Sequence, residues 1–308
     1  MNAFPDKPAP EPLGTDDGKT EHAIVPEGTK AEIVHLPVVG PEGIGPGPAG
    51  SAPTSLLSVP PEPEPRDPAW TGLDVVRLVI LAIVALFVGV GAVLLIAHLW
   101  IEPRSSLATL ERSPIIIVAG QGVAYILLIA YMYVLVARER RRPDFLSAIH
   151  WNWPSKIGPY IFAGFVLSLA LQLLSHLLPM PKSLPIDTFF RTPAEAWVLT
   201  IFGITLAPLI EELFFRGFLY PVLVRGIGKP IAIVFTALAF ALLHGSQLLF
   251  SWGPVLVIFL VGMVLTMVRA YTNSVATGLL IHVAYNGTIS VLMFAATDGF
   301  RHLEKLNQ

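Results

Sequence analysis

The sequence predicts an all-α membrane protein, a polytopic bundle of about seven transmembrane helices that follows a disordered N-terminal tail. Hydrophobic residues make up 54% of the 308-residue chain, charged residues make up 14%, and the mean hydropathy is +0.66. These values exceed the apolar content of ordinary soluble domains. The chain has no cysteine, which excludes disulfides, thiolate metal sites and a cysteine nucleophile. Any catalysis must therefore use oxygen and nitrogen groups.

Residues 1–70 differ in composition from the rest of the chain. They hold 15 of the 28 prolines, with eleven acidic against four basic side chains, and show no sustained apolar periodicity. Such a segment cannot bury enough surface to offset its ordering entropy, so we expect a disordered, acidic, Pro-rich tail. Its first residues also lack the apolar run of a secretory signal. The tail could recruit a partner, but a passive extension is the favoured interpretation.

Residues 71–308 are expected to form the transmembrane domain. A spanning helix needs roughly 20 mainly apolar residues. Seven segments meet or nearly meet this length, the fifth being the shortest: about 75–100, 114–137, 158–178, 196–219, 231–245, 254–271 and 275–296.

The segment between the second and third spans, RERRRPDF, predicts the orientation in the membrane. It carries Arg138, Arg140, Arg141 and Arg142, and the positive-inside rule places such a cluster in the cytoplasm. We therefore expect an integral protein of a bacterial inner membrane, with a cytoplasmic N-terminus and an external C-terminus.

The fourth span contains the stretch ITLAPLIEELFFRGFLYPVL, residues 204–223, in which Glu211, Glu212 and Arg216 interrupt an apolar run. Three charges at a helix centre cost about 10 kcal/mol to insert, against roughly 4 to 8 kcal/mol returned by the apolar residues. The polar face should therefore turn toward other helices or a water-filled cavity. The alternative without a functional role is an interfacial helix end with a solvated ion pair.

Helical spacing separates the two acids of this stretch. Glu212 and Arg216 lie at i and i+4, the favourable order for an ion pair on one face. Glu211 points about 100° away from Glu212, since a helix has 3.6 residues per turn. The spacing predicts a paired Glu212 and a free Glu211, which suits a general base. Pro208 removes a backbone hydrogen bond and predicts a kink.

Two later spans supply further polar groups. His244 closes FTALAFALLH with Phe240 one turn earlier, and His282 and Asn286 lie at i and i+4 within GLLIHVAYNG. Taken singly, His244 suits a helix end, and the His282 face suits hydrogen bonding between helices in lipid. Together with Glu211 they supply a base, a second imidazole and an amide donor, which are the groups that activate water and bind an oxyanion. This combination indicates hydrolysis of an amide or ester inside the membrane.

The three stretches EELFFR, FALLH and HVAYN resemble the EExxxR, FxxxH and HxxxN motifs of the CPBP family. That family comprises CAAX prenyl endopeptidases, bacteriocin-processing and bacteriocin-immunity proteins, also called Abi or lysostaphin-resistance-like proteins. The order and spacing of the motifs agree, and the resemblance covers about residues 193–296, which would be the catalytic core.

The resemblance implies an intramembrane endopeptidase that forms no covalent intermediate and acts on a peptide or protein substrate at the lipid membrane, with no nucleic acid involved. By the same resemblance, Glu211 and His244 would activate the attacking water, and His282 and Asn286 would bind the oxyanion. The supporting residues would be Glu212, Arg216 and Phe240. The active site is expected to open toward the cytoplasm or the inner leaflet.

Three alternatives stay open at this point. Zinc bound by Glu211, His244 and His282 could serve the same reaction, since these are ordinary zinc ligands. A reaction that needs no cofactor is favoured, because the sequence has no HExxH motif and shows no carboxylate behind either histidine. The others are a non-catalytic immunity or scaffold protein and, less favoured because no internal repeat is evident, a proton-coupled transporter.

Overall fold

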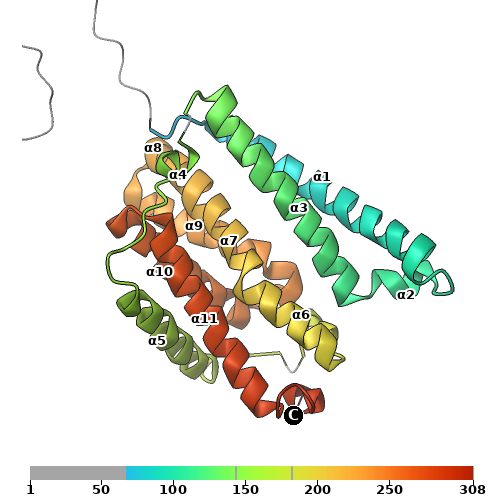
Figure 1. Cartoon of the computed structure of the whole chain (residues 1–308). Coiled ribbons are helices and arrows are strands. Elements are labelled where there is room, and N and C mark those ends of the chain that lie inside the picture. Colours follow the sequence, from blue (N-terminus) through green and yellow to red (C-terminus); the bar gives the residue numbers. More distant parts are fainter. Residues whose placement is uncertain (1–66, 143, 182, 308) are drawn as a thin grey trace, which may run out of the picture. The chain divides into compact units, whose positions relative to one another are not determined.

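A computed structural model describes residues 67–142, 144–181 and 183–307, and within these ranges all regular structure is helical (Figure 1). The predicted disordered tail lies outside the described residues, apart from its last four positions. Among the described residues, six helices are long and apolar enough to cross a membrane: Gly72–Ile101, Pro114–Glu139, Gly158–Ser175, Pro193–Ile227, Trp252–Thr272 and Val275–Ala296. The predicted fold class is thereby confirmed.

Each of the seven predicted spans coincides with a helix or a run of helices. In chain order these are α1 (Gly72–Ile96) with the π-helical η1 (Ala97–Ile101), α2 (Leu107–Glu111), α3 (Pro114–Val134) with the π-helical η2 (Leu135–Glu139), α4 (Phe145–Ala148), α5 (Gly158–Ser175), the 3₁₀ turn η3 (Pro185–Phe189), α6 (Pro193–Ile204), α7 (Leu206–Glu212), the π-helical η4 (Leu213–Leu219), α8 (Tyr220–Ile227), α9 (Lys229–Leu243), the 3₁₀ turn η5 (Gly245–Leu248), α10 (Trp252–Thr272), α11 (Val275–Ala296) and η6 (Leu303–Asn307). Helix α9 has 15 residues, fewer than the roughly 20 of a straight span.

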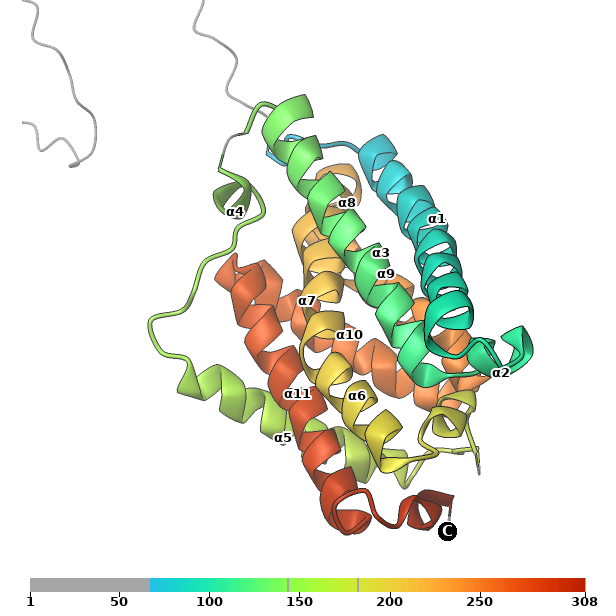
Figure 2. The ribbon, with the colours of Figure 1, turned by 45° about the vertical axis from the view of Figure 1, so that its right-hand side comes forward.

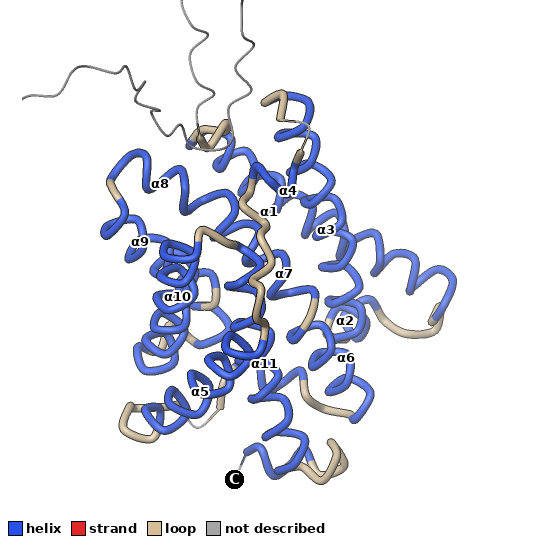
Figure 3. Tube along the Cα trace, turned by 60° about the vertical axis from the view of Figure 1, so that its left-hand side comes forward, coloured by secondary structure: helices blue, strands red, loops and turns tan. Residues whose placement is uncertain are grey.

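Small residues allow the helices to approach closely, as is usual in lipid. Helices α1 and α3 run side by side (Figure 2), and a Cβ added to Gly89 would lie 2.5 Å from the carbonyl oxygen of Gly120. Helix α5 packs along α11 (Figure 3), where a Cβ on Gly164 would lie 2.4 Å from the carbonyl oxygen of Ile281. The second contact fixes α11, the helix that carries His282.

Polar contacts define the two ends of this helical domain. At the first, which we call the Arg140 end, the start of α1 meets the end of η2 through an ion pair between Asp74 and Arg140. At the second, the Phe300 end, the Arg191 side chain before α6 donates to the carbonyl of Arg112 before α3 at 2.8 Å. Trp197 of α6 also contacts Phe300, which follows α11, with ring centroids 5.2 Å apart.

Candidate active site

The helix that carries the two acids is broken just before them. Helix α6 ends at Ile204, Thr205 has φ −111° and ψ −79°, and α7 begins at Leu206. Pro208 has no N–H to donate to the carbonyl of Ile204, which confirms the predicted kink and its cause. The π-helical η4 follows directly after Glu212. The two acids therefore occupy a short helix between two backbone irregularities, and π-helical turns are frequent at functional sites.

Glu212 and Arg216 form a fully buried ion pair, as the helical spacing predicts. The Nη1 of Arg216 lies 2.8 Å from the Oε1 of Glu212, and neither side chain is exposed. The Nη2 of Arg216 donates to the carbonyl of Gly262 on α10 at 3.1 Å. The pair thereby ties the acid-bearing helix to α10.

Glu211 faces a different direction and contacts two imidazoles. Its Oε1 lies 3.6 Å from the Nε2 of His244, and its Oε2 lies 3.6 Å from the Nε2 of His282. Both distances are too long for direct hydrogen bonds. Glu211 keeps 14% of its side chain exposed, so its carboxylate stands free at the point where the two histidines converge.

Both histidines are oriented through their Nδ1 atoms. The Nδ1 of His244 lies 2.9 Å from the carbonyl oxygen of Phe240, and the Nδ1 of His282 lies 3.0 Å from the Oε1 of Glu212. A carbonyl and a carboxylate that already pairs with arginine can only accept, so each Nδ1 is the donor. Each Nε2 is consequently turned toward Glu211.

The contact between Glu212 and His282 corrects one expectation from the sequence. No carboxylate was expected behind either histidine, yet Glu212 fills that place for His282. The two residues are 70 positions apart, and only the packing of α7 against α11 brings them together. Glu212 thus serves the ion pair and the histidine at once.

Gly278 makes this close approach of α11 possible. It precedes His282 by one helical turn, and a Cβ at this position would lie 2.7 Å from the Oε2 of Glu212. That oxygen is buried and has no hydrogen-bond partner among the described residues. Any side chain larger than hydrogen would therefore press on the carboxylate that orients His282.

The Phe240 ring packs against the guanidinium of Arg216 and against the rings of both histidines. The guanidinium carbon of Arg216 lies 4.8 Å from the centroid of the Phe240 ring, within the range of a cation–π contact. The ring centroids of His244 and His282 lie 4.9 and 5.8 Å from that of Phe240. The aromatic residue of the second motif thus contacts Arg216, His244 and His282.

Asn286 lines the cavity, and one N–H of its side-chain amide is already hydrogen-bonded. Its Nδ2 donates to the carbonyl oxygen of Gly203 at 2.7 Å, close to the break between α6 and α7. An amide nitrogen carries two N–H groups, so one donor remains for another acceptor.

A cavity of about 470 Å³ holds all four of the expected catalytic side chains. Its wall is largely apolar, with Glu211, Phe240, His244, His282 and Asn286 at one end; the rest of the lining comprises Pro114, Ile117, Val118, Gln121, Tyr125, Ile186, Phe189, Phe190, Leu199, Thr200, Phe202, Gly203, Ala207, Gln247, Ile258, Val261, Tyr285, Ile289, Ser290 and Met293.

The direction of the cavity conflicts with a pair of expectations from the sequence. On α6 and α7 its lining precedes Glu211, and on α11 it follows His282, so it extends toward the Phe300 end. The cluster of arginines between residues 138 and 142 lies at the other end. A cytoplasmic arginine cluster and a cytoplasmic opening, both expected from the sequence, are therefore incompatible. The span ranges in the sequence could not show on which side of the acids the helices diverge.

The second span contributes polar wall residues that the sequence interpretation missed. Gln121 and Tyr125 lie at i and i+4 on α3 and line the cavity, and the Tyr125 ring stacks on Phe202 at 5.7 Å. The spacing of two polar residues in an apolar span is the same signal that identified His282 and Asn286, and it was available in the stretch GQGVAY. The wall residue Thr200 has an Oγ1 without a partner in the described part of the chain.

His244, His282 and Glu211 are the groups of this site that could bind a metal ion. Two imidazole Nε2 atoms and a carboxylate are suitable zinc ligands, and the Glu212 contact of His282 resembles the carboxylate that often supports a zinc-bound histidine. However, no three histidine or acidic side chains in residues 67–142, 144–181 and 183–307 are arranged to hold one ion. The groups thus match zinc in type, but not in arrangement.

Comparison with known proteins finds a match, and it covers the segment that carries the two acids, His244 and His282. Residues 193–288 match the family model described as type II CAAX prenyl endopeptidase Rce1-like, and the matched segment contains all three motifs. No curated protein and no solved structure matches the chain. The resemblance to CAAX endopeptidases seen in the sequence is confirmed by this match. The protein is an integral membrane protein whose segment 193–288 is similar to the Rce1-like type II CAAX prenyl endopeptidases.

Proposed function

We propose that the protein is an intramembrane endopeptidase that hydrolyses a peptide bond in the cavity with water activated by Glu211 and His244. One observation carries this proposal. Glu211 is the carboxylate on which the Nε2 atoms of two histidines converge, and each of those histidines is fixed through its Nδ1. Such convergence of a base with oriented imidazoles is the arrangement that general acid–base chemistry needs.

Water would bind between Glu211 and His244. With its Nδ1–H donating to Phe240, neutral His244 presents Nε2 as an acceptor, and the Glu211 carboxylate is a second acceptor. A water molecule that donates one hydrogen to each has its oxygen lone pair directed at the substrate. When that oxygen attacks the carbonyl carbon, a C–O bond forms, a proton passes to Glu211 and the carbonyl π electrons move to oxygen.

His282 and Asn286 would bind the resulting oxyanion. In its imidazolium form His282 donates from Nδ1 to Glu212 and from Nε2 to the oxyanion, and Asn286 offers its second N–H. Removal of one such hydrogen-bond donor lowers kcat by about 100- to 1,000-fold. The intermediate collapses when the C–N bond breaks and the leaving amine takes the proton from Glu211, which restores the carboxylate.

The proposed reaction requires no metal. If zinc were bound instead, it would lower the pKa of the attacking water, and Glu211, His244 and His282 would be its ligands. Exhaustive chelation of the purified full-length protein distinguishes the two. We expect full activity after chelation, whereas a loss that zinc reverses would show that the metal-dependent version is correct.

Cleavage profiling of membranes tests the protease activity itself. Membranes containing wild type, Glu211→Ala or His244→Ala are compared by their released peptides, with Glu111→Ala, an exposed acid of α2 outside the cavity, as matched control. Peptides that appear with wild type and Glu111→Ala but not with the other two variants support the proposal. Identical peptide profiles from all four proteins would refute it.

A further inference from the structure

We infer that the substrate reaches Glu211 only from the Phe300 end, and that this end faces the external side of the membrane. The substrate would accordingly be an externally presented peptide segment of a translocated or membrane-anchored protein. The peptide nature of the ligand rests on the proposed function, but the route and its sidedness rest on geometry and charge.

The first argument is the direction of the cavity. From Glu211 the lining follows α7 and α6 back to Leu199, and from His282 it follows α11 forward to Met293. On α3 the lining starts at Pro114 and goes no further than Tyr125. These helices therefore present cavity wall from about the middle of the membrane-spanning region toward the Phe300 end.

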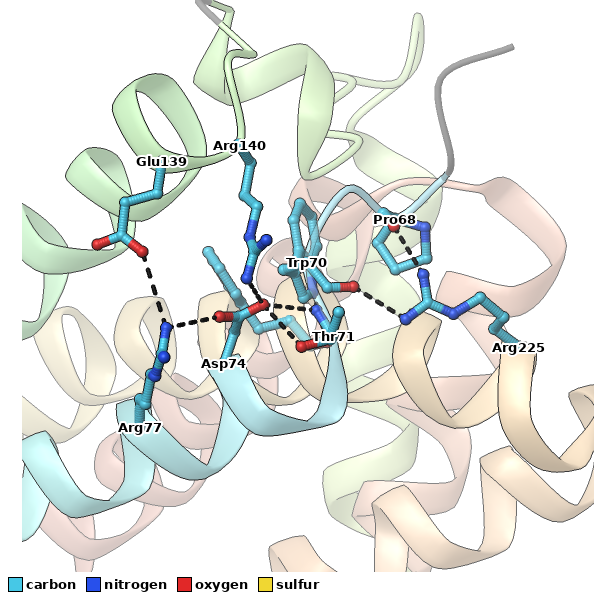
Figure 4. Close-up of polar contacts among 9 residues, drawn as sticks. Pro68, Trp70, Thr71, Asp74, Arg77, Glu139, Arg140 and Arg225 are labelled. Atoms are coloured by element: carbon cyan, nitrogen blue, oxygen red, sulfur yellow. Dashed lines mark hydrogen bonds and ion pairs between the residues drawn. The ribbon is translucent and has the colours of Figure 1, made fainter. Parts of the chain in front are cut away.

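The second argument is that the Arg140 end is closed above the site. Trp70 is only 1% exposed, its Nε1 donates to the carbonyl of Phe218 in η4 at 3.0 Å, and the two rings lie 4.6 Å apart. Figure 4 shows Arg225 donating to the carbonyls of Pro68 and Trp70, at 2.8 and 3.0 Å. The segment before α1 is thereby fixed across the helix that bears Arg216.

A second set of contacts closes the same end over α11. The Nδ1 of His150 pairs with the Nδ2 of Asn273 at 3.1 Å, and the backbone N–H of Val275 donates to the carbonyl of His150 at 3.0 Å. Ile149 next to it is fully buried. The start of α11, which leads to Gly278 and His282, is covered by these residues.

The third argument concerns sidedness. Of the 15 described Lys and Arg residues after position 70, Arg216 lies at the site and the others lie near the ends of the spans or between them. Nine belong to the Arg140 end, namely Arg77, Arg138, Arg140, Arg141, Arg142, Lys156, Arg225, Lys229 and Arg269, and five belong to segments at the other end. Contacts between segments assign the ends, so a miscounted span would not reverse them. The positive-inside rule then places the Arg140 end in the cytoplasm.

The absence of cysteine allows a direct test on the full-length chain. Three single-cysteine variants are made: Ala207→Cys in the cavity wall one turn before Glu211, Thr188→Cys in η3 at the Phe300 end, and Ser147→Cys in α4 at the Arg140 end. Sealed spheroplasts are treated with a charged, membrane-impermeant maleimide, before or after permeabilisation. Wild type gives the background.

We expect Ala207→Cys and Thr188→Cys to be labelled in sealed spheroplasts, and Ser147→Cys to be labelled at least tenfold faster after permeabilisation. The proposed route would be overturned if Ala207→Cys were labelled under the same conditions as Ser147→Cys. It would also be overturned if Ala207→Cys were labelled neither before nor after permeabilisation. Labelling of Ala207→Cys and Thr188→Cys only after permeabilisation would overturn the external substrate. Ser290→Cys in the α11 wall serves as a second cavity position if Ala207→Cys does not fold. Labelling is independent of proteolysis, so these outcomes are separate from a failure of the proposed function.

Discussion

Two carboxylates in this domain, Asp74 and Glu211, differ in how fully they are hydrogen-bonded. At the Arg140 end, Asp74 is fully buried and accepts from the N–H and hydroxyl of Thr71 at 2.8 and 2.9 Å, from Arg77 at 3.3 Å and from Arg140 (Figure 4). In the cavity, Glu211 lies 3.6 Å from each histidine and has no partner at hydrogen-bonding distance among the described residues.

We propose that this difference separates a structural acid from a reactive one. A carboxylate whose acceptor positions are filled by donors stabilises the fold, and a buried polar group left without partners calls for an explanation, a catalytic role among them. Glu212 is intermediate, because its Oε1 contacts both Arg216 and His282 while its Oε2 has no partner within the described part of the chain. Substitutions of these groups test this distinction between a structural and a reactive carboxylate.

The largest expected change comes from removing the partner of Glu212. Arg216→Met leaves a buried carboxylate without its counter-charge, which costs about 3 to 5 kcal/mol of stability. Thermal unfolding of the detergent-purified variant should show this loss. The double variant Glu212→Gln with Arg216→Met should recover much of the stability while remaining inactive, since His282 loses its charged acceptor. A single variant as stable as wild type would contradict the role assigned to this pair.

A smaller effect is expected from Gly278→Ala. The added methyl group would press on the Oε2 of Glu212 and shift the carboxylate that orients His282. A displacement of catalytic groups by about 1 Å can lower the rate by as much as ~100-fold. We expect kcat to fall with little change in KM, measured on a peptide identified by cleavage profiling.

Gly287 offers a matched control on the same helix. A Cβ at Gly287 would meet no atom within 4 Å, so Gly287→Ala should keep the wild-type kcat. Equal losses in the two alanine variants would show that α11 tolerates neither change for reasons of helix packing alone, and that the contact with Glu212 is not the cause.

The smallest effect is expected from Tyr125→Phe. This change removes a hydroxyl from the cavity wall, while the stacking of the ring on Phe202 is retained. We expect less than about a tenfold change in kcat/KM, that is, under ~1.4 kcal/mol, with no change in unfolding temperature. A much larger loss would show that the Tyr125 hydroxyl acts on the reacting groups.

Local spacing allowed much of the site to be predicted. The i and i+4 positions of Glu212 and Arg216 were sufficient to predict their ion pair, and Pro208 was sufficient to predict the break near Thr205. Both depend on the geometry of one helix. The spans were predictable for the same reason, because membrane helices need long apolar runs.

Contacts between distant segments could not be predicted in this way. The pairing of His282 with Glu212, the bond from Asn286 to the carbonyl of Gly203 and the space at Gly278 depend on how α11 packs against α6 and α7. The direction of the cavity likewise depends on where the helices diverge. No periodicity within a single helix carries that information.

The comparison between the two carboxylates is tested most directly by measuring cleavage and unfolding in Glu211→Gln and Asp74→Asn side by side. We predict that Glu211→Gln loses at least about 100-fold in cleavage rate, the lower range for a general base, and unfolds at the wild-type temperature. Asp74→Asn should unfold at a lower temperature and retain wild-type cleavage below that point. Wild-type cleavage by Glu211→Gln would contradict the assignment of Glu211 as the base.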